Sequence, residues 1–177
     1  MSMTVDERVQ WIGTFRFIEV RLMEIAAAWT PTTPEMEAKV VLGRHIWDFA
    51  QHADALGKRT FELRRPEQFS QRPTEGYVDL LDDVARVQPT VERLATLYDA
   101  VLPGLEARYR RYLNETDSLL DGPSVVIIER ILADLPRQRA EVEALRRELG
   151  LATVPSESFR GREAAFATIV APREAAA

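Results

Sequence analysis

The sequence predicts an all-α protein, an antiparallel four-helix bundle. Apolar residues recur at intervals of three and four over most of the chain, which is the period of an amphipathic helix. Prolines and glycines interrupt this period between four long segments, and no segment has the composition or alternation that is typical of a strand. Long amphipathic helices with short breaks pack with their apolar faces together.

The first two helices are separated by the stretch TPTTPE, residues 30–35. Two prolines there cannot continue a helix, and a threonine can cap the next one. The apolar seam of the first helix consists of Trp11, Phe15, Ile18, Leu22, Ile25 and Trp29. The second helix is predicted over residues 34–63, and residues 64–76 form a polar crossing. Its seam consists of Leu42, Ile46, Phe49, Ala53 and Leu56.

A third helical region is predicted over residues 77–113, with an interruption at 88–90. Its main seam consists of Val91, Leu94, Tyr98, Val101, Leu105, Tyr109 and Tyr112. The motif DGP, residues 121–123, opens a fourth helix, because a proline in the first turn loses no hydrogen bond. This helix is predicted to end at Leu149 before Gly150, and Pro136 inside it should kink it.

Two units of unequal size follow from this pattern. Residues 1–150 form the bundle, and residues 151–177 form an extension of weak periodicity with a frayed end. We expect the extension to pack on the bundle or on a second subunit. Its larger apolar side chains are Phe159, Phe166, Ile169 and Val170.

The composition excludes several classes of function. The net charge of −5 argues against nucleic-acid binding, which needs a clustered basic face. The absence of cysteine excludes disulfides and thiolate chemistry. No apolar run approaches a membrane span, and the polar start lacks a secretory signal, so a cytoplasmic protein without membrane contact is expected. Among 23 basic residues only Lys39 and Lys58 are lysine, which favours a bacterial origin.

Two stretches resemble helices of ferritin-like proteins, the four-helix bundles that hold two metal ions. KVVLGRHIWDFAQHADALGKRTFEL, residues 39–63, is similar to the second helix of that superfamily. NETDSLLDGPSVVIIERILADLPRQRAEVEAL, residues 114–145, is similar to the fourth. The resemblance covers residues 15–149. It implies a site of iron or manganese built from one Glu on each of two helices and a Glu-x-x-His pair on each of the other two.

The ligand positions that the resemblance implies are largely altered. The Glu-x-x-His pair of the second helix reads Phe49 and His52, and that of the fourth reads Leu135 and Gln138. Glu19 and Glu106 remain as the acids of the other two helices. The sequence therefore predicts a ferritin-like bundle that has lost its dinuclear metal site and needs no cofactor.

We expect such a protein to act as a small-molecule-binding or accessory protein. Acid–base activity in the former metal pocket is a further expectation, with His52 as acid or base and Glu19 or Glu106 orienting it. The predicted pocket is lined by Phe15, His45, Phe49, Tyr98, Leu102, Leu135 and Gln138.

Two alternatives remain. One is an iron- or manganese-dependent oxidoreductase with an unusual ligand set drawn from Glu19, Asp48, His52 and Glu106. The other is a buried polar network without chemistry, in which an imidazolium or Arg139 neutralises the acids. Asp134 is expected at the solvent-facing rim of its helix.

Self-association as a homodimer is also expected. The third region offers apolar positions that the predicted bundle does not use, namely Val78, Leu80, Leu81, Val84 and Val87.

Overall fold

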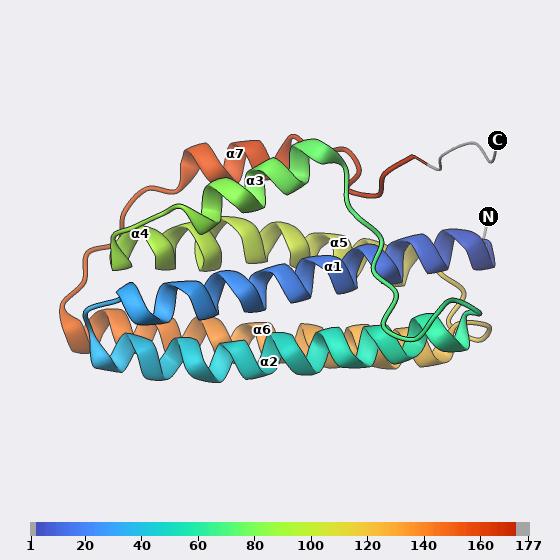
Figure 1. The fold of residues 1–177 in the computed structure, drawn as a ribbon, viewed down its shortest axis with the longest axis horizontal. Coiled ribbons are helices and arrows are strands. Elements are labelled where there is room, and N and C mark those ends of the chain that lie inside the picture. Colours follow the sequence, from blue (N-terminus) through green and yellow to red (C-terminus); the bar gives the residue numbers. More distant parts are fainter. Residues whose placement is uncertain (1–2, 173–177) are drawn as a thin grey trace.

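The computed structural model describes residues 3–172 and is all-helical, as predicted. Within this range, the only pairing of extended segments is an isolated bridge between Pro73 and Val170. The long helices lie side by side along the long axis of the molecule (Figure 1). The frayed end that the sequence predicts lies beyond residue 172, outside the described residues.

The first two helices lie close to their predicted positions. Helix α1 spans Val5–Trp29 and begins at a capping box, in which Thr4 accepts from the Glu7 amide and the Thr4 amide donates to the Glu7 carboxylate. The 3-10 turn η1, Thr30–Thr32, contains the predicted proline break. Helix α2 then spans Met36–Glu62.

The third predicted region consists of several elements: α3 (Glu75–Ala85), α4 (Thr90–Leu94), the π-helical segment η2 (Ala95–Val101) and α5 (Leu102–Glu115). The predicted interruption at residues 88–90 separates α3 from α4. Segment η2 was not expected from the sequence. Short π-helical turns inside α-helices are frequent at functional sites.

Helix α6 spans Gly122–Leu149 and continues through Pro136. It ends at Gly150, whose φ of 62° is the left-handed conformation that glycine adopts at helix ends. The extension contains a further helix, α7 (Glu157–Ala164), where the sequence predicts none.

Two layers are visible in Figure 1. In the lower layer, α1 and α2 are antiparallel, α5 runs in the direction of α2, and α6 runs against both. Helix α2 packs against α1 and α6, and α6 packs against α5. Helices α3 and α7 contact each other and cover α1, η2 and α5 from above. The chain passes from α2 to α5 by one long crossover that includes α3.

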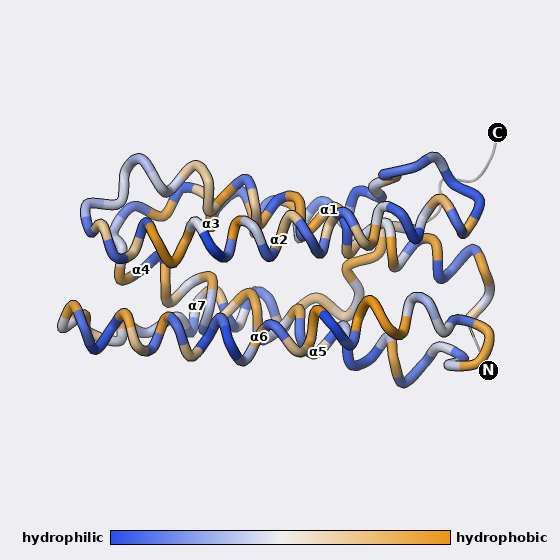
Figure 2. Tube along the Cα trace, turned by 90° about the horizontal axis from the view of Figure 1, so that it is seen from below, coloured by the Kyte–Doolittle hydropathy of each residue, from blue (hydrophilic) through white to orange (hydrophobic). Residues whose placement is uncertain are grey.

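The core is built from the apolar stripes of these helices. Figure 2 shows each long helix changing repeatedly between hydrophobic and hydrophilic residues, as amphipathic helices do. Phe15, Tyr109 and Tyr112 form an aromatic cluster at its centre, with 4.5 Å between the ring centroids of Phe15 and Tyr109. Full burial of such side chains is the main source of stability in a bundle.

The apolar positions of α3 are not available for a dimer contact, contrary to expectation. Val78, Leu80, Leu81 and Val84 are buried in the folded chain, and Val87 packs against the same core. The reason is the second layer, because α3 lies between α1 and α7 rather than at the surface of a simple four-helix bundle.

The extension packs on its own bundle. The rings of Phe166 and Tyr77 meet edge to face, and Ile169 is fully buried. Glu163 forms an ion pair with Arg108 directly above Gly104. A Cβ on Gly104 would lie 1.8 Å from the Glu163 carboxylate, so this approach requires glycine. Within the described residues, no helix is both long and apolar enough to cross a membrane.

Candidate functional site

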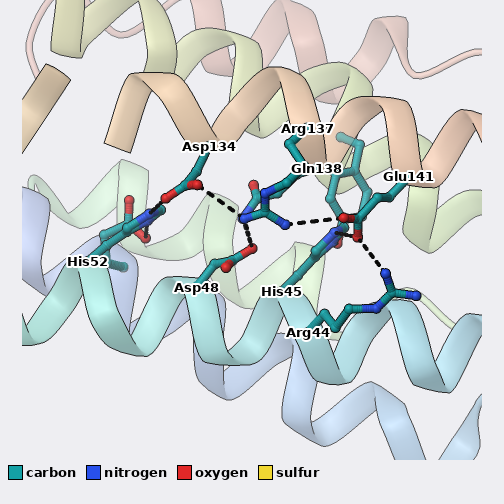
Figure 3. A network of polar contacts seen from close by, with 10 residues as sticks. Arg44, His45, Asp48, His52, Asp134, Arg137, Gln138 and Glu141 are labelled. Atoms are coloured by element: carbon teal, nitrogen blue, oxygen red, sulfur yellow. Dashed lines mark hydrogen bonds and ion pairs between the residues drawn. The ribbon is translucent and has the colours of Figure 1, made fainter. Parts of the chain in front are cut away.

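A row of polar side chains runs between α2 and α6, inside the lower layer (Figure 3). Helix α2 contributes His45, Asp48 and His52, spaced three and four residues apart, which places them on one face. Helix α6 contributes four side chains that face them: Asp134, Arg137, Gln138 and Glu141. The row therefore follows from helical phase on two neighbouring helices.

His52 lies between two carboxylates at one end of the row. Its Nδ1 is 3.2 Å from Oε2 of Glu19, and its Nε2 is 3.1 Å from Oδ2 of Asp134. The Tyr109 hydroxyl donates to the other oxygen of Glu19 at 2.5 Å. The imidazole is only 4% exposed and Glu19 is fully buried.

This environment holds His52 in its charged form. Burial alone would lower the pKa of His52, but the carboxylates of Glu19 and Asp134 outweigh burial and raise it to about 9. Both ring nitrogens then carry hydrogen, and each donates to one carboxylate. His52 is thus a buried imidazolium between one buried and one partly exposed carboxylate at neutral pH.

His45, at the other end of the row, has the opposite charge state. Burial lowers the pKa of His45, and the neighbouring Glu141 carboxylate offsets only part of this effect. Burial also raises the pKa of Tyr98, so its hydroxyl stays protonated and donates to Nδ1 of His45 at 2.5 Å. The remaining hydrogen of the neutral ring is on Nε2, which donates to Glu141 at 3.2 Å.

Arg137 joins the two ends. Its guanidinium contacts Asp48 at 2.8 Å, and Asp134 and Glu141 at 3.2 Å each. Gln138 donates to Asp48 at 3.0 Å, while its own oxygen is buried without a partner among the described residues. Asp48 is therefore a hydrogen-bond acceptor for two α6 side chains, and the row is one connected network.

These residues do not fit a metal ion. In the part of the chain that the structure describes, no three His, Asp or Glu side chains are grouped so that they could hold one. Both nitrogens of His52 act as hydrogen-bond donors, whereas a metal needs a free lone pair on one of them. Asp48 already accepts hydrogen bonds from Arg137 and Gln138.

Glu106, the second predicted acid, belongs to another contact. Its carboxylate pairs with Arg110 at 2.7 Å and with Arg139 at 2.5 Å. Burial would raise the pKa of Glu106, but the two guanidinium groups outweigh burial and lower it. The structure brings Glu19 to His52 but does not bring Glu106 to either of them.

The predicted pocket residues divide into two groups. Four are packed in the hydrophobic core: Phe15, Phe49, Leu102 and Leu135. The polar three, His45, Tyr98 and Gln138, belong to the row. Asp134 was expected at the solvent-facing rim; it is partly exposed, but it also contacts His52. Tyr109 and Glu141 were not among the predicted site residues. The same helical spacing that selects His52 could have found Asp134 and Glu141.

An open groove of about 470 Å³ lies on the outer side of the row, between α2 and α6. His52, Asp48 and Asp134 reach it from the network. Trp47, 66% exposed, and Val126 line it with apolar surface. Its further lining consists of Gln51, Asp54, Ala55, Lys58, Ile127, Arg130 and Ile131. A mixture of apolar walls and a few polar groups is typical of small-molecule sites.

Fold and site together define an all-helical protein with a partly buried ionic network between α2 and α6 and a groove beside it. Comparison of the chain with protein-family models, with curated proteins and with solved structures gives no match.

Proposed function

We propose that this protein is a metal-independent bundle of the ferritin-like type that binds a small organic anion in the groove between α2 and α6. The directions of α1, α2, α5 and α6 support the ferritin-like assignment, because bundles of that type have one long crossover. In this proposal the imidazolium of His52 supplies the positive charge that metal ions supply in related bundles.

The ligand proposal depends on Arg130, an arginine in the groove that is unpaired within the described part of the chain. It lines the groove, and its exposed guanidinium has no hydrogen-bond or ion-pair partner among the described residues. The other charges of the groove are paired within the protein. Lys58 pairs with Asp54 at 2.6 Å, and Asp134 pairs with His52 and Arg137. The unpaired charge in the groove is therefore positive.

The walls of the groove determine the rest of the ligand. The exposed ring of Trp47 and the exposed Val126 favour an apolar or aromatic body. A carboxylate on that body can form two parallel hydrogen bonds with Arg130. The ligand class that fits best is an aromatic carboxylate.

The same geometry favours binding over acid–base catalysis. His45 is fully buried, so no ligand in the groove reaches it. Both N–H groups of His52 are engaged by carboxylates, and with a pKa of about 9 it is a weak acid at neutral pH.

The test is a titration with 2-naphthoate, a fluorescent aromatic carboxylate, by fluorescence anisotropy. We expect binding that weakens roughly tenfold in Arg130→Ala, because a charge-assisted bidentate contact is lost. Arg147→Ala is the matched control, since Arg147 is an exposed arginine on the same helix outside the groove. Absence of saturable binding, or equal weakening in both variants, would refute the proposed site.

A further inference from the structure

The outer face of α2 carries an apolar stripe, most of which no part of the described chain covers. Its large members, Met36, Val40, Trp47 and Phe61, are all exposed. Gly43 and Ala50 lie between them, so the stripe advances by alternating steps of four and three residues from Met36 to Ala50. That spacing is the seam of a two-helix coiled coil. The stripe lies on the side of α2 opposite to the buried His45 and Phe49.

We propose that this stripe is the contact between two copies of the chain, with their α2 helices packed antiparallel about a two-fold axis. The axis lies midway between the levels of Trp47 and Ala50. Trp47 then faces the partner's Ala50, and Met36 faces the partner's Phe61. Because the axis is two-fold, each of these contacts occurs twice.

The shape of the stripe suits this arrangement. A tryptophan needs a small residue opposite it, and the proposed register places the partner's Ala50 there. Gly43 has open space around it, because a Cβ at this position would meet nothing within 4 Å. The stripe is interrupted between Ala50 and Phe61, because the next positions of the spacing are Asp54, which pairs with Lys58, and Gly57, which Gln68 covers.

The charges beside the stripe select a second copy in antiparallel orientation. Glu37 and Lys58 flank the stripe on the same side, near its two ends. In the antiparallel pair Glu37 faces the partner's Lys58 at both ends, whereas in a parallel pair these two residues lie at opposite ends of the contact and do not meet. Lys58 also contacts Asp54, but that pair is exposed and can be shared.

The dimer and the ligand site are separate proposals. Trp47, Asp54 and Lys58 line the groove and also lie at the proposed contact, but Arg130 is on α6 and takes no part in the stripe. Loss of the dimer would leave the Arg130 contact in place.

The first test is the molar mass in solution, by size-exclusion chromatography with light scattering. We expect a species of twice the 20.1 kDa mass of the chain that becomes monomeric in Val40→Glu. Val5→Glu is the control, because Val5 is an equally exposed valine near the start of α1. A monomer at all concentrations overturns the proposal, and so does a dimer that survives Val40→Glu.

A charge exchange then tests the orientation. Glu37→Lys and Lys58→Glu each place equal charges opposite each other and should each raise the dimer dissociation constant about fivefold, an effect reduced by salt. The double variant restores the opposite pairing and should restore the wild-type constant. Additive weakening in the double variant would overturn the antiparallel arrangement.

Discussion

His52 and Asp134 face each other across α2 and α6, with Nε2 of the imidazole 3.1 Å from Oδ2 of the carboxylate. On the opposite side of the ring, Glu19 is 1% exposed, whereas Asp134 is 31% exposed. The imidazolium therefore donates to one deeply buried carboxylate and to one that borders the groove, and Arg137 supplies a second positive charge beside Asp134. Removal of His52 would leave the buried Glu19 carboxyl without its counter-charge.

The stability of the protein should fall as the pH rises through the pKa of His52. The pKa is about 9 in the folded protein and about 6.5 in an unfolded chain, so the stabilisation is complete below 6.5 and is lost as the pH passes 9. Between pH 7 and 10 the wild type should lose roughly 2–3 kcal/mol of unfolding free energy relative to His52→Gln. Urea denaturation across this range measures the difference. If the unfolding free energies of the wild type and of His52→Gln changed in parallel with pH, a charged His52 would be contradicted.

Glu19 and His52 should be strongly coupled energetically. His52→Leu leaves a buried carboxylate without its counter-charge and should destabilise by roughly 3–5 kcal/mol. Adding Glu19→Met to this variant should recover much of that loss, because the uncompensated charge is removed. Glu106→Gln, which alters a partly exposed ion pair, should cost about 1 kcal/mol or less. Additive losses in the double variant would show that the two residues act independently.

Two buried tyrosines provide a matched comparison. Tyr98 donates to His45, so Tyr98→Phe leaves Nδ1 of that ring unsatisfied and should destabilise by about 1–3 kcal/mol. The hydroxyl of Tyr77 is buried without a hydrogen-bond partner among the described residues, so Tyr77→Phe should be neutral or stabilising. Thermal unfolding of both variants measures the contrast. Equal losses would mean that the hydroxyl of Tyr98 does not support His45.

The packing of α7 against α5 should depend on Gly104. Gly104→Ala places a methyl group on the Glu163 carboxylate, so the ion pair of Glu163 with Arg108 must open. We expect faster proteolytic cleavage within residues 151–172 and a loss of at least about 2 kcal/mol. Gly161→Ala, in α7 itself, meets no atom within 4 Å and should be neutral or stabilising. Unchanged cleavage in Gly104→Ala would mean that Glu163 does not hold the helix.

The positions of the long helices were predictable because local signals agree there. Proline and glycine breaks coincide with changes of apolar phase, as at residues 30–35 and at Gly150. Helix α7 was not predictable in this way. Its buried contact is made by a charged residue, Glu163, whose partner Arg108 is 55 residues away. Such a contact leaves no local apolar pattern.

The candidate site was predictable only in part. Helical phase placed Glu19 and His52 in the core, and these two residues do meet. The ferritin-like pattern predicted that the site residues of the fourth helix are Leu135 and Gln138. The α6 residues that contact the two histidines are instead Asp134 and Glu141, which lie close to those positions on the helix. The charge states of the histidines depend on burial and on distant carboxylates, which the sequence does not reveal.

The measurement that tests the proposed core most directly is a pH titration of the imidazole nitrogens by NMR with ¹⁵N-labelled histidine. The chain has two histidines, so the spectrum contains two rings to assign, and His52→Gln identifies one of them. We predict that His52 stays doubly protonated through neutral pH and titrates near 9, while His45 stays neutral with hydrogen on Nε2 at pH 7. A neutral His52 at pH 7, with a resonance that shifts when zinc is added, would contradict the imidazolium and restore the metal site.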